Sequence, residues 1–191
     1  MLTEKVKELI KKSRIVSFHN WSKTYSSEVV AIFQQADDQS RYLTDEETEK
    51  LQSINPDLKK SLLQAQVLRD SATEIINNAR AEIMAAYPNI TEPGGGLYPP
   101  MRAEACWRDF WHFLRCISYG IAGQQTNYTS SQGLGYMEQL YQELQVPLDA
   151  MILGLENLKI HSLKHFSPAE AENLASYFDV LIDQMKKFAV A

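Results

Sequence analysis

The sequence predicts an all-α protein, and three observations carry that prediction. Between glycine and proline breakers, the apolar residues recur at a spacing near 3.6, which is the period of an amphipathic helix. No segment alternates between apolar and polar residues with the period of two that marks a strand. Helix starts are recognisable at Thr44 with Glu47 and at Ser167-Pro168 with Glu170. Because the helices differ in length, we expect them to cross at large angles rather than form a regular bundle.

The first half of the chain is expected to hold five helices. Thr3 caps the first, Ser26 or Ser27 caps the second, and Pro88 ends the last. A connector at Ile15–Trp21 separates the first two, and the helix that Thr44 opens ends near residue 54 or continues past a bend. The predicted segments are residues 4–12, 26–36, 44–54, 58–68 and 72–84.

A loop rich in glycine and proline, residues 88–100, divides the two halves. A long, strongly apolar helix over Met101–Ala122 follows it, and we expect this helix to be central. The remaining predicted helices are residues 136–144, 148–158 and 168–185.

Composition limits the kinds of function that the chain can have. With 45% hydrophobic and 23% charged residues, the 191-residue chain has the composition of a soluble globular protein. Its longest apolar stretch, Cys116–Ala122, is far shorter than the roughly 20 residues of a membrane-spanning helix. A net charge of -5 makes nucleic acid an unsuitable partner. Its two cysteines provide neither a disulfide framework nor a zinc site, so we expect no bound metal.

The chemistry concentrates on the long helix. Cys106 and Asp109 are expected on one face with Phe110, whereas Arg108 points elsewhere unless its long stem curls back. A thiol, a carboxylate and an arginine could hold a covalent ligand: the thiol forms the bond, the carboxylate accepts N–H groups and the arginine pairs with the ligand's acids. On spacing alone, a buried cysteine beside an exposed Arg–Asp pair is the better interpretation.

Residues 106–123 resemble the bilin-attachment helix of phycobiliproteins, the allophycocyanin and phycocyanin subunits of cyanobacteria and red algae. The matching positions are Cys106, Arg108, Asp109, Leu114, Arg115, Tyr119, Gly120 and Gly123. The flanking segments that are similar to the family's motifs are residues 36–43, 87–95, 135–147, 166–171 and 177–179. The resemblance therefore covers about Val29 to Met185, nearly the whole chain.

The resemblance implies a globin-like phycobiliprotein fold with extra N-terminal helices that pair subunits. We expect this domain over residues 25–191, preceded by an N-terminal extension, residues 1–24. Cys106 would carry phycocyanobilin or a related linear tetrapyrrole through a thioether. Asp109 would accept hydrogen bonds from its central N–H groups, and Arg108 would pair with a propionate.

The resemblance also implies a subunit interface and further pigment contacts. Asp37 and Arg115 match a pair that the family uses between subunits, and Tyr119 is assigned to the same interface. Arg102, Trp111 and His112 are added as candidates for pigment binding. The bland interpretation of Arg115 is an ordinary solvated helix charge, and that of His112 is a hydrogen-bonded structural residue.

Several positions depart from the family pattern. Trp111 stands where allophycocyanins usually have a polar residue, His112 stands in place of a tyrosine, and Trp107 adds bulk beside the attachment face. The extension over residues 1–24 is either a solvated arm or a docking element for assembly.

Two functions therefore remain open. The first is a light-harvesting subunit that carries a bilin at Cys106 and passes excitation on. The second is a non-harvesting paralogue, an assembly or regulatory protein of phycobilisomes or photosystems, with or without pigment. An enzyme is not expected, because the chain lacks paired carboxylates, a Ser/His/Asp order and a phosphate loop. A haem globin would need an axial ligand for the iron. The histidines of this chain offer no clear proximal position; they are His19, His112, His161 and His165.

The expected partner is a phycobiliprotein subunit, in a homodimer or a heterodimer, together with phycobilisome or photosystem components. Because the N-terminus is charged and has no apolar signal core, we expect a cytoplasmic protein, free or held peripherally on the cytoplasmic face of the thylakoid membrane.

Overall fold

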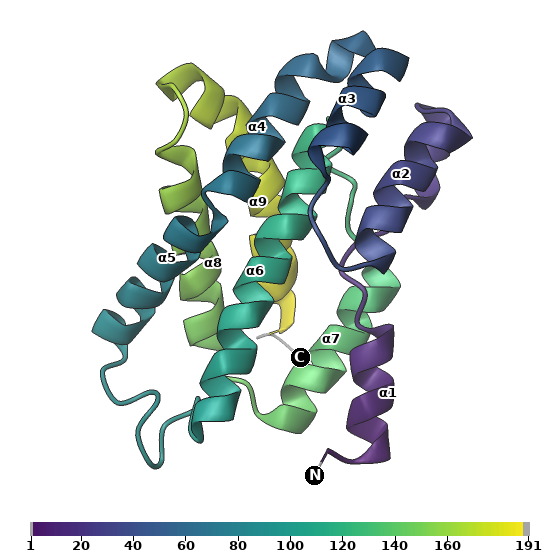
Figure 1. Ribbon diagram of the computed structural model, residues 1–191. Coiled ribbons are helices and arrows are strands. Elements are labelled where there is room, and N and C mark those ends of the chain that lie inside the picture. Colours follow the sequence, from purple (N-terminus) through teal and green to yellow (C-terminus); the bar gives the residue numbers. More distant parts are fainter. Residues whose placement is uncertain (1, 189–191) are drawn as a thin grey trace.

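The central element of the molecule is the 23-residue helix α6 (Pro100–Ala122), against which several of the other helices pack (Figure 1). The computed structural model describes residues 2–188, and within them it contains nine α-helices, two short 3-10 helices and no strand. The predicted all-α class is therefore confirmed. The elements are α1 (Glu4–Lys12), η1 (His19–Lys23), α2 (Ser27–Asp38), α3 (Asp45–Ile54), η2 (Pro56–Leu58), α4 (Lys59–Asp70), α5 (Ala72–Ala86), α6 (Pro100–Ala122), α7 (Ser131–Leu144), α8 (Leu148–Leu163) and α9 (Pro168–Phe188).

The predicted helix starts are made by the expected side chains. Thr44 caps α3 through a complete capping box, in which it accepts the N–H of Glu47 and the Glu47 carboxylate accepts the Thr44 N–H. Thr3 caps α1, and Ser26 rather than Ser27 caps α2. The helix opened by Thr44 does not continue past a bend, because α3 ends at Ile54 and a 3-10 turn leads into α4.

The two halves of α6 differ in burial. Every residue from Phe113 to Ala122 is buried, whereas the first half leaves several polar side chains partly open. Helix α6 packs against α4, α5, α8 and α9 (Figure 1). Its contact with α8 depends on Gly154, where an added Cβ would lie 2.1 Å from the ring of the fully buried Phe110.

The segment before α2 is packed against the rest of the chain. Helix α1 lies along α7 (Figure 1), where it buries Val6 and Leu9. The connector after it runs beside residues 128–130: the Ser17 N–H donates to the Tyr128 carbonyl at 2.9 Å, and the side chain of Trp21 is completely buried. The interpretation of residues 1–24 as a solvated arm is therefore wrong for residues 2–24, although a domain boundary at residue 24 stays a prediction.

Candidate functional site

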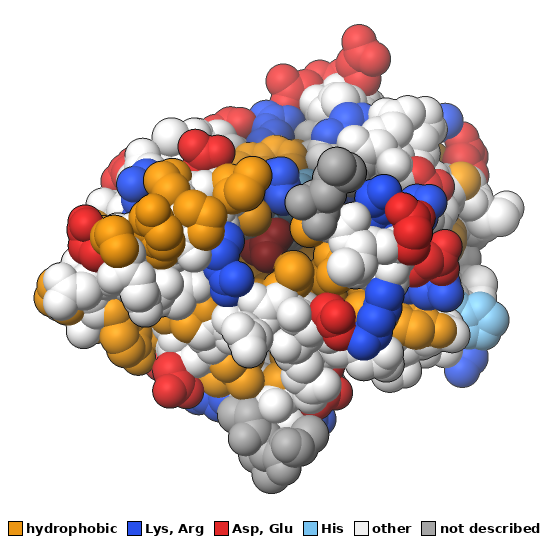
Figure 2. All heavy atoms as spheres, turned by 90° about the horizontal axis from the view of Figure 1, so that it is seen from below, with side chains coloured by type: hydrophobic (Ala, Val, Ile, Leu, Met, Phe, Trp, Pro, Cys, Tyr) orange, Lys and Arg blue, Asp and Glu red, His pale blue; other side chains and the backbone are white. Residues whose placement is uncertain are grey.

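A cavity of about 590 Å³ opens beside the first half of α6. Helix α6 forms one wall, α7 a second, and the N-terminal segment a third. Figure 2 shows the molecule from the end at which α1 begins, with a hollow that has an acidic side chain in its depth and basic and hydrophobic side chains around it. The lining residues are Leu2, Ile10, Ser13, Arg14, Ile15, Asp37, Ser40, Ala105, Arg108, Asp109, His112, Phe113, Arg115, Met137, Leu140, Tyr141 and Leu144.

One face of α6 supplies the polar part of this lining. Ala105, Arg108, Asp109 and His112 follow one another at i, i+3, i+4 and i+7, so that they form a stripe along the cavity. Arg108 and Asp109 line the same space, as in the alternative in which the long arginine stem curls back. Arg108 is exposed and forms no ion pair with any residue that the structure describes.

Asp109 is the acceptor of this cavity. Burial raises the pKa of its carboxyl group to about 6, although the nearby Arg108 charge and a hydrogen bond from Tyr141 oppose the shift. The Tyr141 hydroxyl lies 3.5 Å from Asp109 Oδ2, which is long for a hydrogen bond. At neutral pH Asp109 is thus mainly an ionised acceptor with most of its lone pairs unused.

Arg115 lies deep in the same cavity and is tied to the α2 residue Asp37. Its Nη1 donates to Asp37 Oδ1 and to the Tyr119 hydroxyl, both at 2.8 Å, and all three side chains are buried. Arg14 also bonds to Asp37, with its Nε 3.2 Å from Oδ2. The Nε of Arg115 is buried and has no partner among the described residues. These residues pair within one chain, so that their use between subunits stays a prediction.

His112 lies on the cavity wall as a neutral side chain. Burial, together with the smaller effects of the positive charges of Arg115 and Arg108, lowers its pKa to about 4. Its Nδ1 is buried without a hydrogen-bond partner among the described residues. Trp111, in contrast, does not line the cavity, because its ring packs edge-on against Tyr42 with the centroids 4.9 Å apart.

Cys106 lies on the neighbouring side of α6. Its Sγ is 3.0 Å from Met151 Sδ on α8, and the residue is only 5% exposed. Burial, followed by the negative charge of Asp109, raises the pKa of the thiol. Phe110, four residues after Cys106, lies on the same side, and its ring packs at Gly154 of α8. The thiol packs toward α8 and does not line the cavity, whereas the Asp109 carboxylate, three residues later, does line it.

Arg102 contacts the backbone instead of lining the cavity. Its guanidinium donates to the carbonyl groups of Gly96, Leu144 and Gln145 at 3.2, 2.8 and 2.9 Å. It thereby ties the α5–α6 connection to the end of α7.

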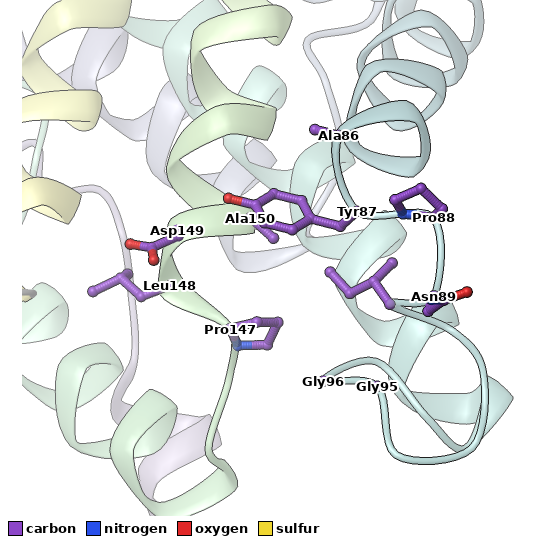
Figure 3. A pocket seen from close by; sticks show the side chains of 11 residues that line it. Ala86, Tyr87, Pro88, Asn89, Gly95, Gly96, Pro147, Leu148, Asp149 and Ala150 are labelled. Atoms are coloured by element: carbon purple, nitrogen blue, oxygen red, sulfur yellow. The ribbon is translucent and has the colours of Figure 1, made fainter.

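A second, mostly apolar groove of about 720 Å³ lies between the α5–α6 connection and the start of α8 (Figure 3). Tyr87, Pro88 and Ile90 line one side of it, and Pro147 and Leu148 line the other. Cys106, Arg108 and Asp109 are not part of its lining. We therefore place the candidate site in the cavity beside Asp109, although the groove is larger.

The cavity walls that other helices provide could not be predicted from the sequence. Met137, Leu140 and Tyr141 come from α7, and Leu2 and Ile10 come from the N-terminal segment. The only signal for them was the apolar periodicity of each helix, which does not tell which helices meet. No group of three His, Cys, Asp or Glu side chains within residues 2–188 is arranged to hold a metal ion. None of the helices in this range is long and apolar enough to span a membrane.

Comparison with known proteins decides the family. Residues 31–185 match the family described as phycobilisome protein. The chain belongs to the phycobilisome protein family. The resemblance stated from the attachment-helix motif is thereby confirmed, and the all-α architecture agrees with the globin-like fold of the family.

Named relatives of this phycobilisome protein are allophycocyanin subunits. It is 33% identical to an allophycocyanin alpha-B chain of Synechococcus sp. over 158 residues, which cover 83% of this chain and 97% of the relative. It is 30% identical to an allophycocyanin alpha-B chain of Porphyra purpurea, over 78% of this chain and 93% of the relative. It is 29% identical to an allophycocyanin alpha chain of Mastigocladus laminosus, over 75% of this chain and 90% of the relative. The family match begins after α1 and η1, so that these two elements lie outside it.

Proposed function

We propose that this chain is a light-absorbing phycobilisome subunit that carries a linear tetrapyrrole of the phycocyanobilin class in the cavity beside α6. In this proposal the pigment is linked to Cys106 through a thioether, and the subunit passes its excitation to neighbouring pigments. The observation that carries the proposal is the position of Asp109, an acceptor with unused lone pairs that lines a cavity together with three arginines and lies three residues from a cysteine on the same helix.

The lining suits the chemistry of such a pigment. A linear tetrapyrrole presents N–H groups along its centre, carboxylates on its propionate chains and apolar ring edges. Asp109 can accept the N–H groups, and an ionised acceptor favours the protonated, cationic pigment. Arg108, which is exposed and without an ion pair among the described residues, can pair with a propionate. Met137 and Leu140 offer apolar surface to the rings.

The position of Cys106 sets a condition on attachment. Its side chain must turn away from Met151 toward the cavity, a rotation about one Cα–Cβ bond. Because burial raises the pKa of the thiol, little of the reactive thiolate is present at neutral pH. We therefore expect attachment to depend on a lyase that binds the chain and provides a base.

The decisive experiment compares the two cysteines of the chain. The protein is co-expressed with the enzymes that make phycocyanobilin and with a panel of lyases, and the denatured band is tested for zinc-induced fluorescence. Cys106→Ala should abolish the fluorescence, whereas Cys116→Ala, the matched control at a fully buried position, should keep it. Asp109→Asn should keep the bond but shift the absorption to the blue or dim it.

Other results would redirect the proposal. A fluorescent Cys106→Ala band would move the linkage to another residue, and unchanged spectra of Asp109→Asn would remove this residue from the pigment site. A colourless wild-type protein with every lyase of the panel would overturn the pigment proposal and favour the second candidate.

The second candidate is a pigment-free assembly or regulatory subunit of the phycobilisome or a photosystem. The observation that favours it is the buried Cys106 thiol, which packs on Met151 and does not line the cavity. Both candidates are non-enzymatic. Each implies pairing with itself or another phycobiliprotein subunit in the cytoplasm or at the cytoplasmic face of the thylakoid membrane. Size measurement of Asp37 and Arg115 variants tests whether this buried pair contributes to the pairing.

A further inference from the structure

We infer that the N-terminal segment, residues 2–15, is part of the ligand site, and that Leu2 and Ile10 contact the bound ligand and shield it from water. This inference rests on the proposed function for the identity of the ligand, a linear tetrapyrrole. It concerns residues that precede the family match, which begins at residue 31.

The lining of the cavity is the first observation. Leu2, Ile10, Ser13, Arg14 and Ile15 line the same cavity as Asp109. They come from one short stretch that faces α6 across the cavity, so that a ligand held by Asp109 would have this stretch at its opposite side.

The second observation is the pattern of burial along α1. Val6 and Leu9 are buried against α7, but Leu2 and Ile10 remain 51% and 48% exposed. Leu2, which precedes α1, and Ile10 are both apolar and border the cavity, whereas the exposed positions of α1 other than Ile10 carry charges, such as Lys7. An apolar ligand surface in the cavity would cover Leu2 and Ile10 and remove them from water.

The third observation is that the segment is held in place. At its start, Lys5 forms an ion pair with Glu143 of α7. At its end, Arg14 bonds to Asp37 and Asp38, and the carbonyl of Arg14 lies so close to Gly133 that an added Cβ there would be 1.6 Å away. The wall is therefore fixed on both sides of the cavity and is present before any ligand binds.

The charge of the cavity identifies the class of ligand. Three arginines line it, Arg14, Arg108 and Arg115, against two carboxylates, Asp37 and Asp109. An extended apolar molecule with acidic groups fits this combination of arginines and apolar walls, and a linear tetrapyrrole with two propionates is such a molecule.

The test compares two double variants with matched exposure. Leu2→Ser/Ile10→Ser changes the wall, and Leu63→Ser/Ile160→Ser changes a leucine and an isoleucine that are 52% and 50% exposed on α4 and α8, away from the cavity. Because the four side chains are similarly exposed, the two double variants should shift the urea midpoint by similar amounts.

The first readout uses the pigment-free protein and an aromatic anion, 8-anilinonaphthalene-1-sulfonate. We expect its fluorescence to rise with wild type and with Leu63→Ser/Ile160→Ser, and its affinity to fall at least fivefold with Leu2→Ser/Ile10→Ser. Absence of binding to wild type, or equal affinity for the two double variants, would overturn the inference.

The second readout uses protein loaded with phycocyanobilin. Hydrogen exchange of the α1 amides should slow on loading, and oxidative bleaching of the pigment by persulfate should be several times faster in Leu2→Ser/Ile10→Ser than in the matched control. If wild type takes up no bilin, the proposed function fails while the anion experiment still tests the wall. If wild type takes up bilin but both double variants bleach alike and α1 exchange is unchanged, the inference that Leu2 and Ile10 contact the ligand is overturned, and the proposed function stands.

Discussion

The carboxylate of Asp109 is ionised at neutral pH in surroundings that disfavour its charge. Burial raises its pKa from the usual 3.8 to about 6, and the opposing effects of Arg108 and Tyr141 are smaller. A shift of about two pKa units corresponds to about 3 kcal/mol between the two protonation states. The free protein thus keeps a destabilising charge at the place where a ligand with N–H groups would compensate it.

Asp109→Asn should therefore stabilise the pigment-free protein. Between pH 4 and 6 the folded protein binds a proton at Asp109 that the unfolded chain has lost. Raising the pH through this range therefore lowers the contribution of Asp109 to the free energy of unfolding. At pH 7 the variant should be more stable than wild type by up to about 3 kcal/mol, and at pH 4 the two should be nearly equal. Urea unfolding at both pH values measures the difference.

The comparison with wild type is needed because His112 acts in the opposite direction. Its pKa is lowered to about 4, mainly by burial, so the unfolded chain binds more protons at this residue and stability falls as the pH drops from about 6.5 to 4. Only the difference between the variant and wild type isolates Asp109. A loss of stability that is equal at pH 7 and pH 4 would show that Asp109 has a structural role and no cost.

At the scale of elements, the packing of α6 against α8 depends on a missing side chain. Gly154 leaves room for the ring of Phe110, and an added Cβ would also lie 2.7 Å from a methyl group of Ile83. Alanine is a better helix former than glycine by about 1 kcal/mol, but overpacking a dense core costs about 1–3 kcal/mol. The two effects oppose one another at this position, and the short contacts favour the second.

Gly154→Ala should therefore lower the free energy of unfolding by about 1–2 kcal/mol. The matched control is Gly135→Ala in α7, where an added Cβ meets nothing within 4 Å. There only the helix preference acts, so the control should gain about 0.5–1 kcal/mol. Urea unfolding of the pair decides the matter, since changes of the same sign in both variants would contradict this account of the α6–α8 contact.

Elements with local signals could be predicted from the sequence. The start of α3 follows from Thr44 and Glu47, and the start of α9 follows from Ser167, whose N–H and hydroxyl group both donate to the Glu170 carboxylate. Those signals depend on neighbouring residues alone. The burial of Cys106 could not be predicted in the same way, because it depends on Met151, which is 45 positions away.

The cavity shows the same limit more strongly. The family motif predicts Asp109 and Arg108 as site residues and Arg115 as an interface residue. It could not place Leu2 or Tyr141 beside them, because this requires knowing that α1 lies along α7 and that both face α6. Long-range contacts of this kind depend on the whole fold, whereas each helix could be predicted from its own residues.

At the scale of the whole molecule, the part of the chain before α2 falls into two segments with different contributions to stability. Residues 2–12 bury only Val6 and Leu9, but the following connector buries Phe18 and Trp21 in the common core. Full burial of an aliphatic side chain contributes about 1.5–3 kcal/mol, and truncation of a buried aromatic residue costs about 3–5 kcal/mol.

Two deletions should separate these parts. Removal of residues 1–12 should lower the free energy of unfolding by a few kcal/mol and leave a folded protein, whereas removal of residues 1–23 should leave most molecules unfolded. The second deletion removes two large core side chains, and total stabilities are only about 5–15 kcal/mol. Circular dichroism during urea titration distinguishes the outcomes. Equal stability of the two truncated proteins would mean that the connector contributes nothing to the core.

The contact between Cys106 and Met151 has a consequence for how this family is surveyed. A cysteine that fills its place between two helices contributes to stability in every molecule, with or without a pigment attached. Natural selection would then preserve it in a lineage that has given up light absorption, just as it preserves any other well-packed small side chain. A count of coloured members that relies on attachment cysteines would therefore include colourless ones, and the destabilising Asp109 charge together with the exposed Arg108 is the better criterion.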